Sequence, residues 1–435
     1  MFERARLWWS RLTDSLWFVP AAMIFGAAML AVAMVALSDV VDDEMMANYP
    51  RIFGASAQSS REMLSTIAGA MMTVAGVTFS ITILAVAQAS SQYTPRILRN
   101  FMRDRANQVT LGTLTGVFVY CLIVLRTVRG DEDQPFVPAL AVLVAFGLAI
   151  VAIGVLVYFI HHIASALQAS HILARVRTDT IAAVDNLFPD DVGEEAADEH
   201  WPLPPEHSWR TVRARHTGYI SHVDADGLIA SAESLDVVVR MERGIGEHVI
   251  AGTPIFSVTA AVVEDDLEQR LNRLVEVSSF RTVDQDPAFG FRQMVDMAVK
   301  ALSPGVNDTS TAVASIDAIG AALVKLADRR IEHRYRLCDG TLRLIAHGPT
   351  FTSLTDTALN EIRQNAEGNV SVLARLLATI EIVVGVTANA SRRALLLDHA
   401  SRILAAGERS VPDEQDRAGL RGAFARVRDA VNRAG

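Results

Sequence analysis

The sequence has very little lysine and cysteine. Of its 40 basic residues only two, Lys300 and Lys325, are lysines, and only Cys121 and Cys338 carry thiols. Two cysteines cannot form a disulfide framework, and their separation is not that of a metal-binding knuckle. We therefore expect no structural disulfide and no metal site, and we assign the thiols no function.

Charged residues and catalytic motifs are also scarce. Charged residues make up 20% of the chain, hydrophobic residues make up 51%, and the net charge is -9. This composition excludes a disordered chain and a general surface for nucleic acid, and it is too apolar for an ordinary soluble enzyme. The sequence contains no G-x-S-x-G, H-E-x-x-H, P-loop or dinucleotide-binding pattern. We predict that the protein is not an enzyme and needs no cofactor.

Long apolar runs dominate the first 165 positions, in contrast. Crossing a hydrocarbon layer takes about 20 apolar residues, and four runs are long enough: residues 16–37, 63–89, 109–128 and 136–160. The first run is longer than the apolar core of a cleavable signal peptide, so we expect it to stay as an anchor. We predict a transmembrane domain over residues 1–165.

Loop charges predict the orientation of this domain. Arginines next to a span are retained on the cytoplasmic side. The loop after the second span carries Arg96, Arg99, Arg103 and Arg105, whereas the other two loops are acidic. Both termini are therefore expected in the cytoplasm.

The second span carries a stripe of small or hydroxylated residues at alternating spacings of three and four. The members of this stripe are Thr66, Gly69, Thr73, Gly76 and Ser80. Such spacing places them on one face of a helix. One interpretation is the water-facing wall of a pore, and the other is close packing between helices. Thr78 and Thr82 form a second short row, and Gly112-x-x-x-Gly116 in the third span favours close packing there.

Beyond the membrane half, the composition predicts three further segments. Residues 166–208 read as a connecting helix and an acidic, proline-rich linker. Residues 209–262 read as a small β-barrel module, because β-branched residues alternate between glycines at 218, 227, 244, 246 and 252. Residues 263–435 read as mainly helical, with helices near 264–277, 287–302, 308–328, 352–364, 370–384, 391–406 and 412–432 and one hairpin near 335–346.

The β module resembles the lipoyl and biotinyl carrier domains. Their paired G-x-x-V and G-x-P-[LI] elements match residues 246–249 and 252–255. Carrier domains attach their cofactor to a lysine, and this module contains none. A structural or docking barrel is one interpretation, and an unrelated small barrel with glycine turns is the other.

A cluster of polar and turn-forming residues lies within 281–312. Its members are Arg281, Gln285, Asp286, Ser303, Pro304, Asn307 and Asp308. One interpretation is a tight turn between two helices, in which Asn307 or Asp308 caps the second helix. The other is a polar ligand site or a contact between subunits.

Four stretches together carry a resemblance to a known family. They are SITILAVAQASSQYTPRIL (80–98), GTPIFSV (252–258), QDPAFGFRQMVDMAVKALSPGVND (285–308) and LRLIAHGPTF (342–351). With the four spans, they resemble the bacterial predicted membrane proteins catalogued as domain of unknown function 2254. The resemblance implies a membrane location and an architecture but no activity. We expect the membrane to be the bacterial inner membrane. The family turn is commonly followed by proline, whereas Thr309 stands here.

Two functional hypotheses follow for an α-helical membrane protein with four transmembrane helices and a cytoplasmic α+β region. In the first, several copies associate in the lipid bilayer as a homo-oligomer, and their second spans surround a path for an ion or small solute. The cytoplasmic region then serves for assembly and gating. In the second, the chain is a membrane-anchored scaffold or sensor that binds a cytoplasmic partner or ligand and conducts nothing.

Overall fold

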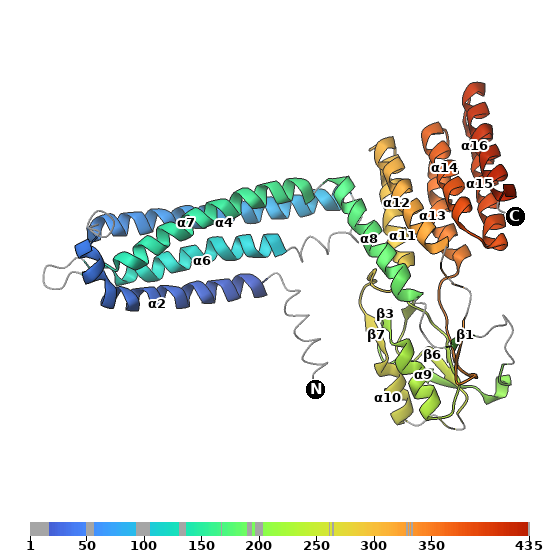
Figure 1. Cartoon of the computed structure of the whole chain (residues 1–435), viewed down its shortest axis with the longest axis horizontal. Coiled ribbons are helices and arrows are strands. Elements are labelled where there is room, and N and C mark those ends of the chain that lie inside the picture. Colours follow the sequence, from blue (N-terminus) through green and yellow to red (C-terminus); the bar gives the residue numbers. More distant parts are fainter. Residues whose placement is uncertain are drawn as a thin grey trace. The chain divides into compact units, whose positions relative to one another are not determined.

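The protein comprises two compact units, Met1–Gln168 and Ala169–Gly435. The computed structural model describes residues 17–48, 56–92, 105–129, 136–166, 168–188, 194–195, 203–260, 262, 265–327, 329, 331 and 334–433. Figure 1 shows helices alone in the described part of the first unit, and both helices and sheets in the second.

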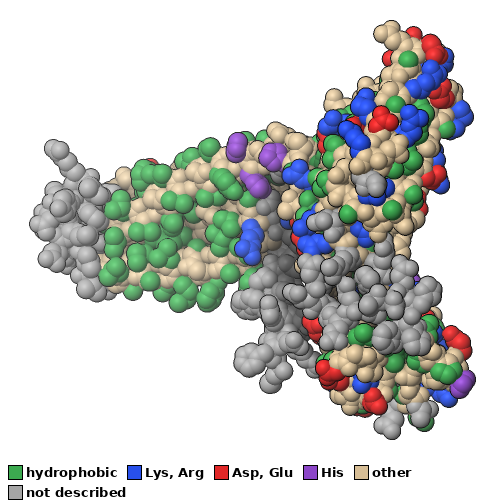
Figure 2. Space-filling model, turned by 45° about the vertical axis from the view of Figure 1, so that its right-hand side comes forward, with side chains coloured by type: hydrophobic (Ala, Val, Ile, Leu, Met, Phe, Trp, Pro, Cys, Tyr) green, Lys and Arg blue, Asp and Glu red, His purple; other side chains and the backbone are tan. Residues whose placement is uncertain are grey.

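In its described residues, the first unit is a bundle of four long helices. They are α2 (Phe18–Asn48), α4 (Ala57–Gln92), α6 (Arg105–Thr127) and α7 (Ala139–Ala166). Each contains most of one apolar run, and at a rise of about 1.5 Å per residue each is long enough for a hydrocarbon layer of about 30 Å. Apolar side chains cover much of the visible surface of this unit (Figure 2). Phe25, Leu84 and Ile150 are among the exposed ones, as expected for contact with lipid.

A fifth helix also has the length and composition of a membrane span. It is α12 (Thr309–Ala327), which has a mean hydropathy of 1.4, compared with 1.9 to 3.0 for the four bundle helices. More than half of its apolar window is buried inside the second unit, where Ile316, Ile319 and Leu323 are completely covered. The expected number of four spans therefore stays a prediction.

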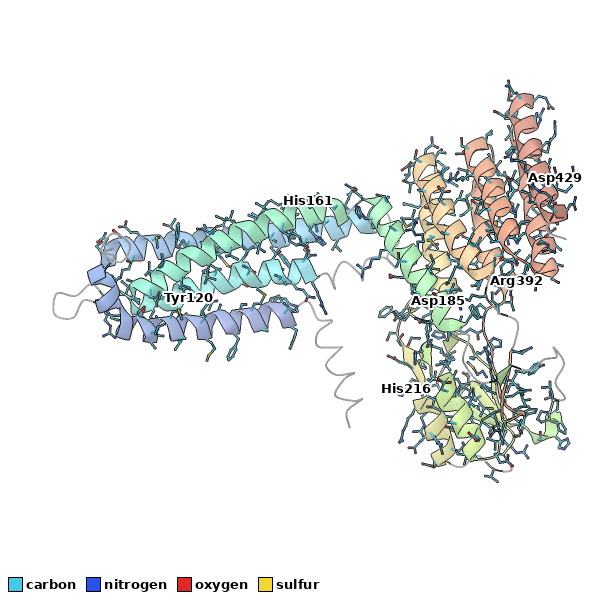
Figure 3. The ribbon with its side chains drawn as sticks, viewed as in Figure 1. Tyr120, His161, Asp185, His216, Arg392 and Asp429 are labelled. Atoms are coloured by element: carbon cyan, nitrogen blue, oxygen red, sulfur yellow. The ribbon has the colours of Figure 1, made fainter. Side chains whose placement is uncertain are left out.

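Helix α6 lies at the centre of the bundle and packs against α2, α4 and α7. Its Leu114, Cys121 and Val124 side chains are fully buried. The Tyr120 hydroxyl donates a hydrogen bond of 3.0 Å to the Ala141 carbonyl oxygen on α7. Figure 3 shows Tyr120 and His161 toward opposite ends of the bundle.

Close packing between α2 and α6 depends on the Gly112-x-x-x-Gly116 pair. A Cβ atom at Gly112 would lie 2.6 Å from the Met23 sulfur and 3.1 Å from the Pro20 Cα atom. A Cβ atom at Gly116 would lie 3.4 Å from that of Ala27. The motif thus brings two helix backbones together, as small residues do in membrane bundles.

The described residues of the second unit form two open sheets. The larger has the strand order β1-β8-β9-β4-β6-β2, and the smaller has the order β5-β3-β7. Their strands are β1 (Glu194–Glu195), β2 (Arg210–Arg213), β3 (Gly218–Val223), β4 (Val239–Met241), β5 (His248–Val249), β6 (Pro254–Val258), β7 (Val275–Ser278), β8 (Tyr335–Cys338) and β9 (Thr341–Ile345). Ile220, Val239, Phe256 and Val258 belong to the apolar core that these strands share with two helices, α9 (Ala225–Ser234) and α10 (Asp265–Arg273).

Several details of the β region differ from the sequence prediction. Among the described strands no sheet closes into a barrel, so the predicted barrel is wrong. Gly227 lies in α9 rather than in a turn between strands, because Asp224 caps that helix by accepting from the Gly227 N–H. The helix predicted over 264–277 ends at Arg273 and is followed by β7, which pairs with β3.

The hairpin near 335–346 exists, and it joins the larger sheet. Strand β9 pairs in parallel with β4, with Val239 opposite Leu344. Leu342 and Leu344 are buried, which explains the pairing, since an isolated two-stranded hairpin would leave these side chains in water. The hairpin therefore belongs structurally to the β region and not to the helices that flank it in the sequence.

The remaining long elements in the described part of the second unit are helices. They are α8 (Ala169–Leu187), α11 (Pro287–Leu302), α12, α13 (Phe351–Asn365), α14 (Val370–Val386), α15 (Ala390–Ser410) and α16 (Glu414–Arg433). Helix α8 packs against α11 and α12, α12 against α14, and α14 against both α15 and α16 (Figure 1). Helices α11 to α16 follow the predicted ranges closely, because their apolar periodicity and caps are local features of the sequence.

The Gly112 contact yields a test of the bundle. We expect Gly112→Val to lower the apparent melting temperature of the detergent-purified protein, because the added side chain overlaps Met23 and overpacking costs about 1–3 kcal/mol. Gly147→Val in α7 is the matched control, since a Cβ atom there meets nothing within 4 Å. The fraction of each variant that stays monodisperse after heating gives its apparent melting temperature. Equal decreases in melting temperature for the two variants would contradict the contact between Gly112 and Met23.

Candidate functional site

The stripe on α4 faces away from its own bundle. Thr66, Gly69, Thr73, Gly76 and Ser80 are all exposed. A Cβ atom at either glycine would meet nothing within 4 Å. The stripe therefore makes no close helix contact within the described part of this chain.

The hydroxyl groups of the stripe are bound to their own helix. Thr66, Thr73 and Ser80 each donate to the carbonyl oxygen four residues earlier, over 2.7, 2.9 and 2.9 Å. These bonds satisfy each donor while leaving acceptor lone pairs on the oxygen. The stripe is thus compatible with an apolar surrounding and can also accept hydrogen bonds from water.

The opposite face of α4 packs into the bundle. Leu64, Ala68, Met71 and Ala75 are buried there. Thr78 and Thr82 continue this face and are also buried. The two polar rows of the second span therefore have different surroundings, one outside the bundle and one inside.

In the second unit, three of the predicted polar residues lie at the start of α11. Arg281 donates two hydrogen bonds to the Asp286 carboxylate, over 2.8 and 3.0 Å, and its guanidinium lies 5.1 Å from the centre of the Phe289 ring. Asp286 is buried and caps α11 by accepting from the Phe289 N–H. Gln285 accepts from the Val223 N–H, next to the irregular pairing of β3.

A glycine turn of the β region packs directly on this ion pair. Gly246 has φ +81°, and a Cβ atom there would lie 2.3 Å from Asp286 Oδ2 and 2.8 Å from an Arg281 nitrogen. Arg281, Gln285 and Asp286 thus hold the smaller sheet against the start of α11. Their observed contacts are structural.

The other four predicted residues lie at the opposite end of α11. Ser303 ends that helix, and Asn307 has φ +47° in the turn that follows. The Asp308 carboxylate accepts from the Thr311 hydroxyl over 2.6 Å and from the Thr311 N–H over 3.0 Å, which lowers the pKa of Asp308. Asp308 therefore caps α12, as in the interpretation of this segment as a tight turn between two helices.

These two groups do not form one site. They are separated by the 16 residues of α11, a length of about 24 Å. Pro304 lies in the turn between α11 and α12. The seven residues predicted as one cluster therefore act at two separate places.

A surface cavity of about 430 Å³ lies beside the turn that contains Asn307. Its lining is polar and comes from the end of α11 and the connection between α13 and α14: Leu302, Asn307, Asn365, Glu367, Gly368, Asn369, Val370 and Ser371. Asn369 caps α14 and donates a 3.0 Å hydrogen bond to the Thr309 hydroxyl. Thr309, where the resemblance implies proline, thus supplies a side-chain contact between two helix starts.

The described part of the second unit also contains a group of possible metal ligands and a buried histidine. Glu233, Cys338 and Asp339 bring potential ligand atoms within 4.8 Å of one another at the surface. His399 is 1% exposed and lies 3.3 Å from Asp356 Oδ1. Burial lowers the pKa of His399, and the nearby Asp356 carboxylate opposes this shift only in part.

The buried amides Asn107 and Gln108 near the start of α6 were not among the predicted site residues. Their signal in the sequence is two adjacent amide residues just inside an apolar helix. This signal is weak, because such residues usually lie at an interface with water. Gly246 was identified as a turn glycine, but its contact with Asp286 joins parts of the chain 40 positions apart and has no local signature.

Comparisons with known proteins give a consistent result. A family model described as "Predicted membrane protein (DUF2254)" matches residues 13–381. Uncharacterised proteins of Mycobacterium bovis and Mycobacterium tuberculosis are each 31% identical over 446 aligned residues, which cover 100% of this chain and 84% of each relative. No solved structure matches the chain.

Gly246 and Gly252 form a matched pair for testing the junction at α11. Both have positive φ, +81° and +87°, but a Cβ atom at Gly252 meets nothing within 4 Å. We expect Gly246→Ala to destabilise the protein by about 1–3 kcal/mol more than Gly252→Ala, because only Gly246 contacts Asp286. Thermal unfolding of the two variants in detergent measures the difference, and equal effects would exclude this contact.

His399 predicts a pH dependence of stability. Its pKa is lowered in the folded state, so folding favours neutral imidazole, and this contribution is complete only above the unfolded pKa of about 6.5. As the pH falls below that value, wild type should lose up to about 1.4 kcal/mol of stability per pH unit more than His399→Gln. Melting curves of both proteins across this range test the prediction, and parallel pH profiles would contradict it.

Proposed function

Since the chain belongs to the predicted membrane protein family of domain of unknown function 2254, we propose that it acts without enzymatic chemistry as a homo-oligomeric channel or transport-like protein. The proposed location is the bacterial inner membrane. One observation carries the proposal: the whole stripe of α4 lies on the outside of the bundle, and the described residues of the first unit leave it uncovered.

The composition of the stripe supports association between copies. Small residues on a membrane helix permit another helix to approach closely, because no long side chain intervenes. Around the stripe, α4 also exposes large apolar side chains, including Met72, Val77 and Leu84. A surface that contacts lipid alone would have no need for a continuous row of glycine, threonine and serine.

In the proposed channel, hydroxyl oxygens of the stripe form the wall of the conducting path. The oxygens of Thr66, Thr73 and Ser80 keep free lone pairs after bonding to their own helix, so they can accept from water. Polar groups within a membrane generally face a bundle interior or a water-filled cavity. Several copies arranged around their α4 helices would provide that cavity.

The second unit is proposed to serve for assembly and gating on the cytoplasmic side. The positive-inside rule supports this orientation, because Arg105 begins α6 and Arg175 and Arg177 lie on α8. The Arg281–Asp286 junction gives this unit a fixed connection between its smaller sheet and its helices. Such a connection is suited to passing a displacement from one part of the unit to another.

A substitution in the stripe tests conduction. Thr73→Leu should reduce flux through reconstituted protein, because it replaces a hydroxyl on the proposed wall with a larger apolar side chain. Thr113→Leu in α6 is the matched control, since Thr113 is half-exposed and also donates to the carbonyl oxygen four residues earlier. Liposome flux assays with small ions and solutes measure the effect relative to wild type.

Two results would contradict the proposal. One is unchanged flux in Thr73→Leu and in the corresponding variants of Thr66 and Ser80. The other is a monomer in native mass analysis of the detergent-purified protein, because a single bundle of four helices leaves the stripe outside.

The cavity beside Asn307 favours a second candidate, a membrane-anchored sensor or scaffold. Its lining offers amide and hydroxyl groups suited to a polar ligand. The lining residues come from two helix connections. In this case residues 169–435 should bind the same partner or ligand as the full chain, and substitutions in the stripe should leave binding unchanged. Loss of binding by a folded fragment of this length would count against it.

A further inference from the structure

The bundle contains buried polar groups that no described residue satisfies. Thr78 on α4 and Asn107 and Gln108 on α6 are each 1% exposed. The Thr78 hydroxyl oxygen and both amide atoms of Asn107 and of Gln108 have no hydrogen-bond partner in the described part of the chain. Native proteins satisfy nearly all such groups with protein atoms or with ordered water.

The register of α4 and α6 places a buried hydroxyl of α4 level with one of these groups. Arg61 donates a 2.8 Å hydrogen bond to the Val128 carbonyl oxygen, which fixes one end of the antiparallel pair. Thr82 lies 21 positions further along α4, and Asn107 lies 21 positions back along α6. Both helices rise equally per residue, so Thr82 and Asn107 lie at about the same level, with Thr78 one turn deeper.

The chemistry of these side chains selects a neutral ligand. Amide and hydroxyl groups both donate and accept hydrogen bonds, which matches water. The buried polar side chains described in this unit are Ser38, Ser60, Thr78, Thr82, Asn107, Gln108 and Thr110. None of them is a carboxylate, ammonium or guanidinium group that would balance an ion of either sign.

We propose that water enters each bundle at the end where α6 begins and hydrates Thr78, Asn107 and Gln108 in a blind recess. An apolar layer closes the recess. Ala75 lies one turn beyond Thr78 and is level with Leu114, again by counting from Arg61 and Val128. Both residues are buried, as is Cys121 beyond them.

The recess lies inside one chain and is distinct from the stripe. From Arg105 to Leu114 it extends about 14 Å along α6, close to half the thickness of a hydrocarbon layer. Water within it places most of a transmembrane potential across the remaining apolar layer. This inference does not rest on the proposed channel, and substitutions inside the recess leave the stripe unchanged.

Cysteine labelling tests the recess in the full chain. In a Cys338→Ser background, single Thr78→Cys, Thr82→Cys and Asn107→Cys variants are reconstituted and treated with a charged, membrane-impermeant methanethiosulfonate. Thr→Cys is nearly isosteric, and Asn107→Cys probes the recess from the facing helix. Ala75→Cys is the matched buried control, one turn beyond Thr78, and the native Cys121 reports labelling deeper in the bundle.

We expect the three recess thiols to react at least about tenfold faster than Ala75→Cys, because a thiol must ionise to react and ionisation requires water. Reaction should occur only when the reagent is added on the side where Arg105 lies. Rates equal to those of Ala75→Cys in variants that remain monodisperse would overturn the proposal. Equal labelling from both sides would overturn the apolar closure.

Discussion

The packing of α4 against α6 is the contact on which the first unit depends. It buries Leu64, Ala68, Met71 and Ala75 against the centre of the bundle. A helix has only one face opposite its buried one, so this packing also directs Thr66, Thr73 and Ser80 outward. The same contact places Thr78 and Thr82 inward. One helix thus presents one polar row to the outside of the bundle and another to the interior of the bundle.

A comparable dependence occurs in the second unit around Asp286. This carboxylate caps α11, binds Arg281 in bidentate geometry and excludes any side chain at Gly246. A single buried charge therefore fixes the start of one helix and the approach of one turn of the β region. Breaking a buried pair of this kind costs more than the pair contributes, because the remaining charge stays uncompensated. The junction is a rigid element rather than a flexible hinge.

Local features of the sequence predicted the helices well and the sheets poorly. Pro287–Leu302 was identified at its exact bounds because Asp286, Pro287 and the apolar periodicity are all local signals. The pairing of Val239 with Leu344 joins positions far apart and has no such signal. The α4 stripe was predicted by spacing, but spacing says only which residues share a face. The direction of that face depends on α6, and so does the burial of Asn107.

The parallel pairing of β4 with β9 also constrains the order in which the second unit is made. Helices α11 and α12 lie between these strands in the chain, so the larger sheet is incomplete until Ile345 has been synthesised. Contacts of such long sequence separation form slowly, since the loop must close before the pairing contributes. A fragment that ends near residue 262 would leave the edge of β4 unpaired and open to other chains. The β region and the helices α11 and α12 are therefore one folding unit, although the sequence presents them in succession.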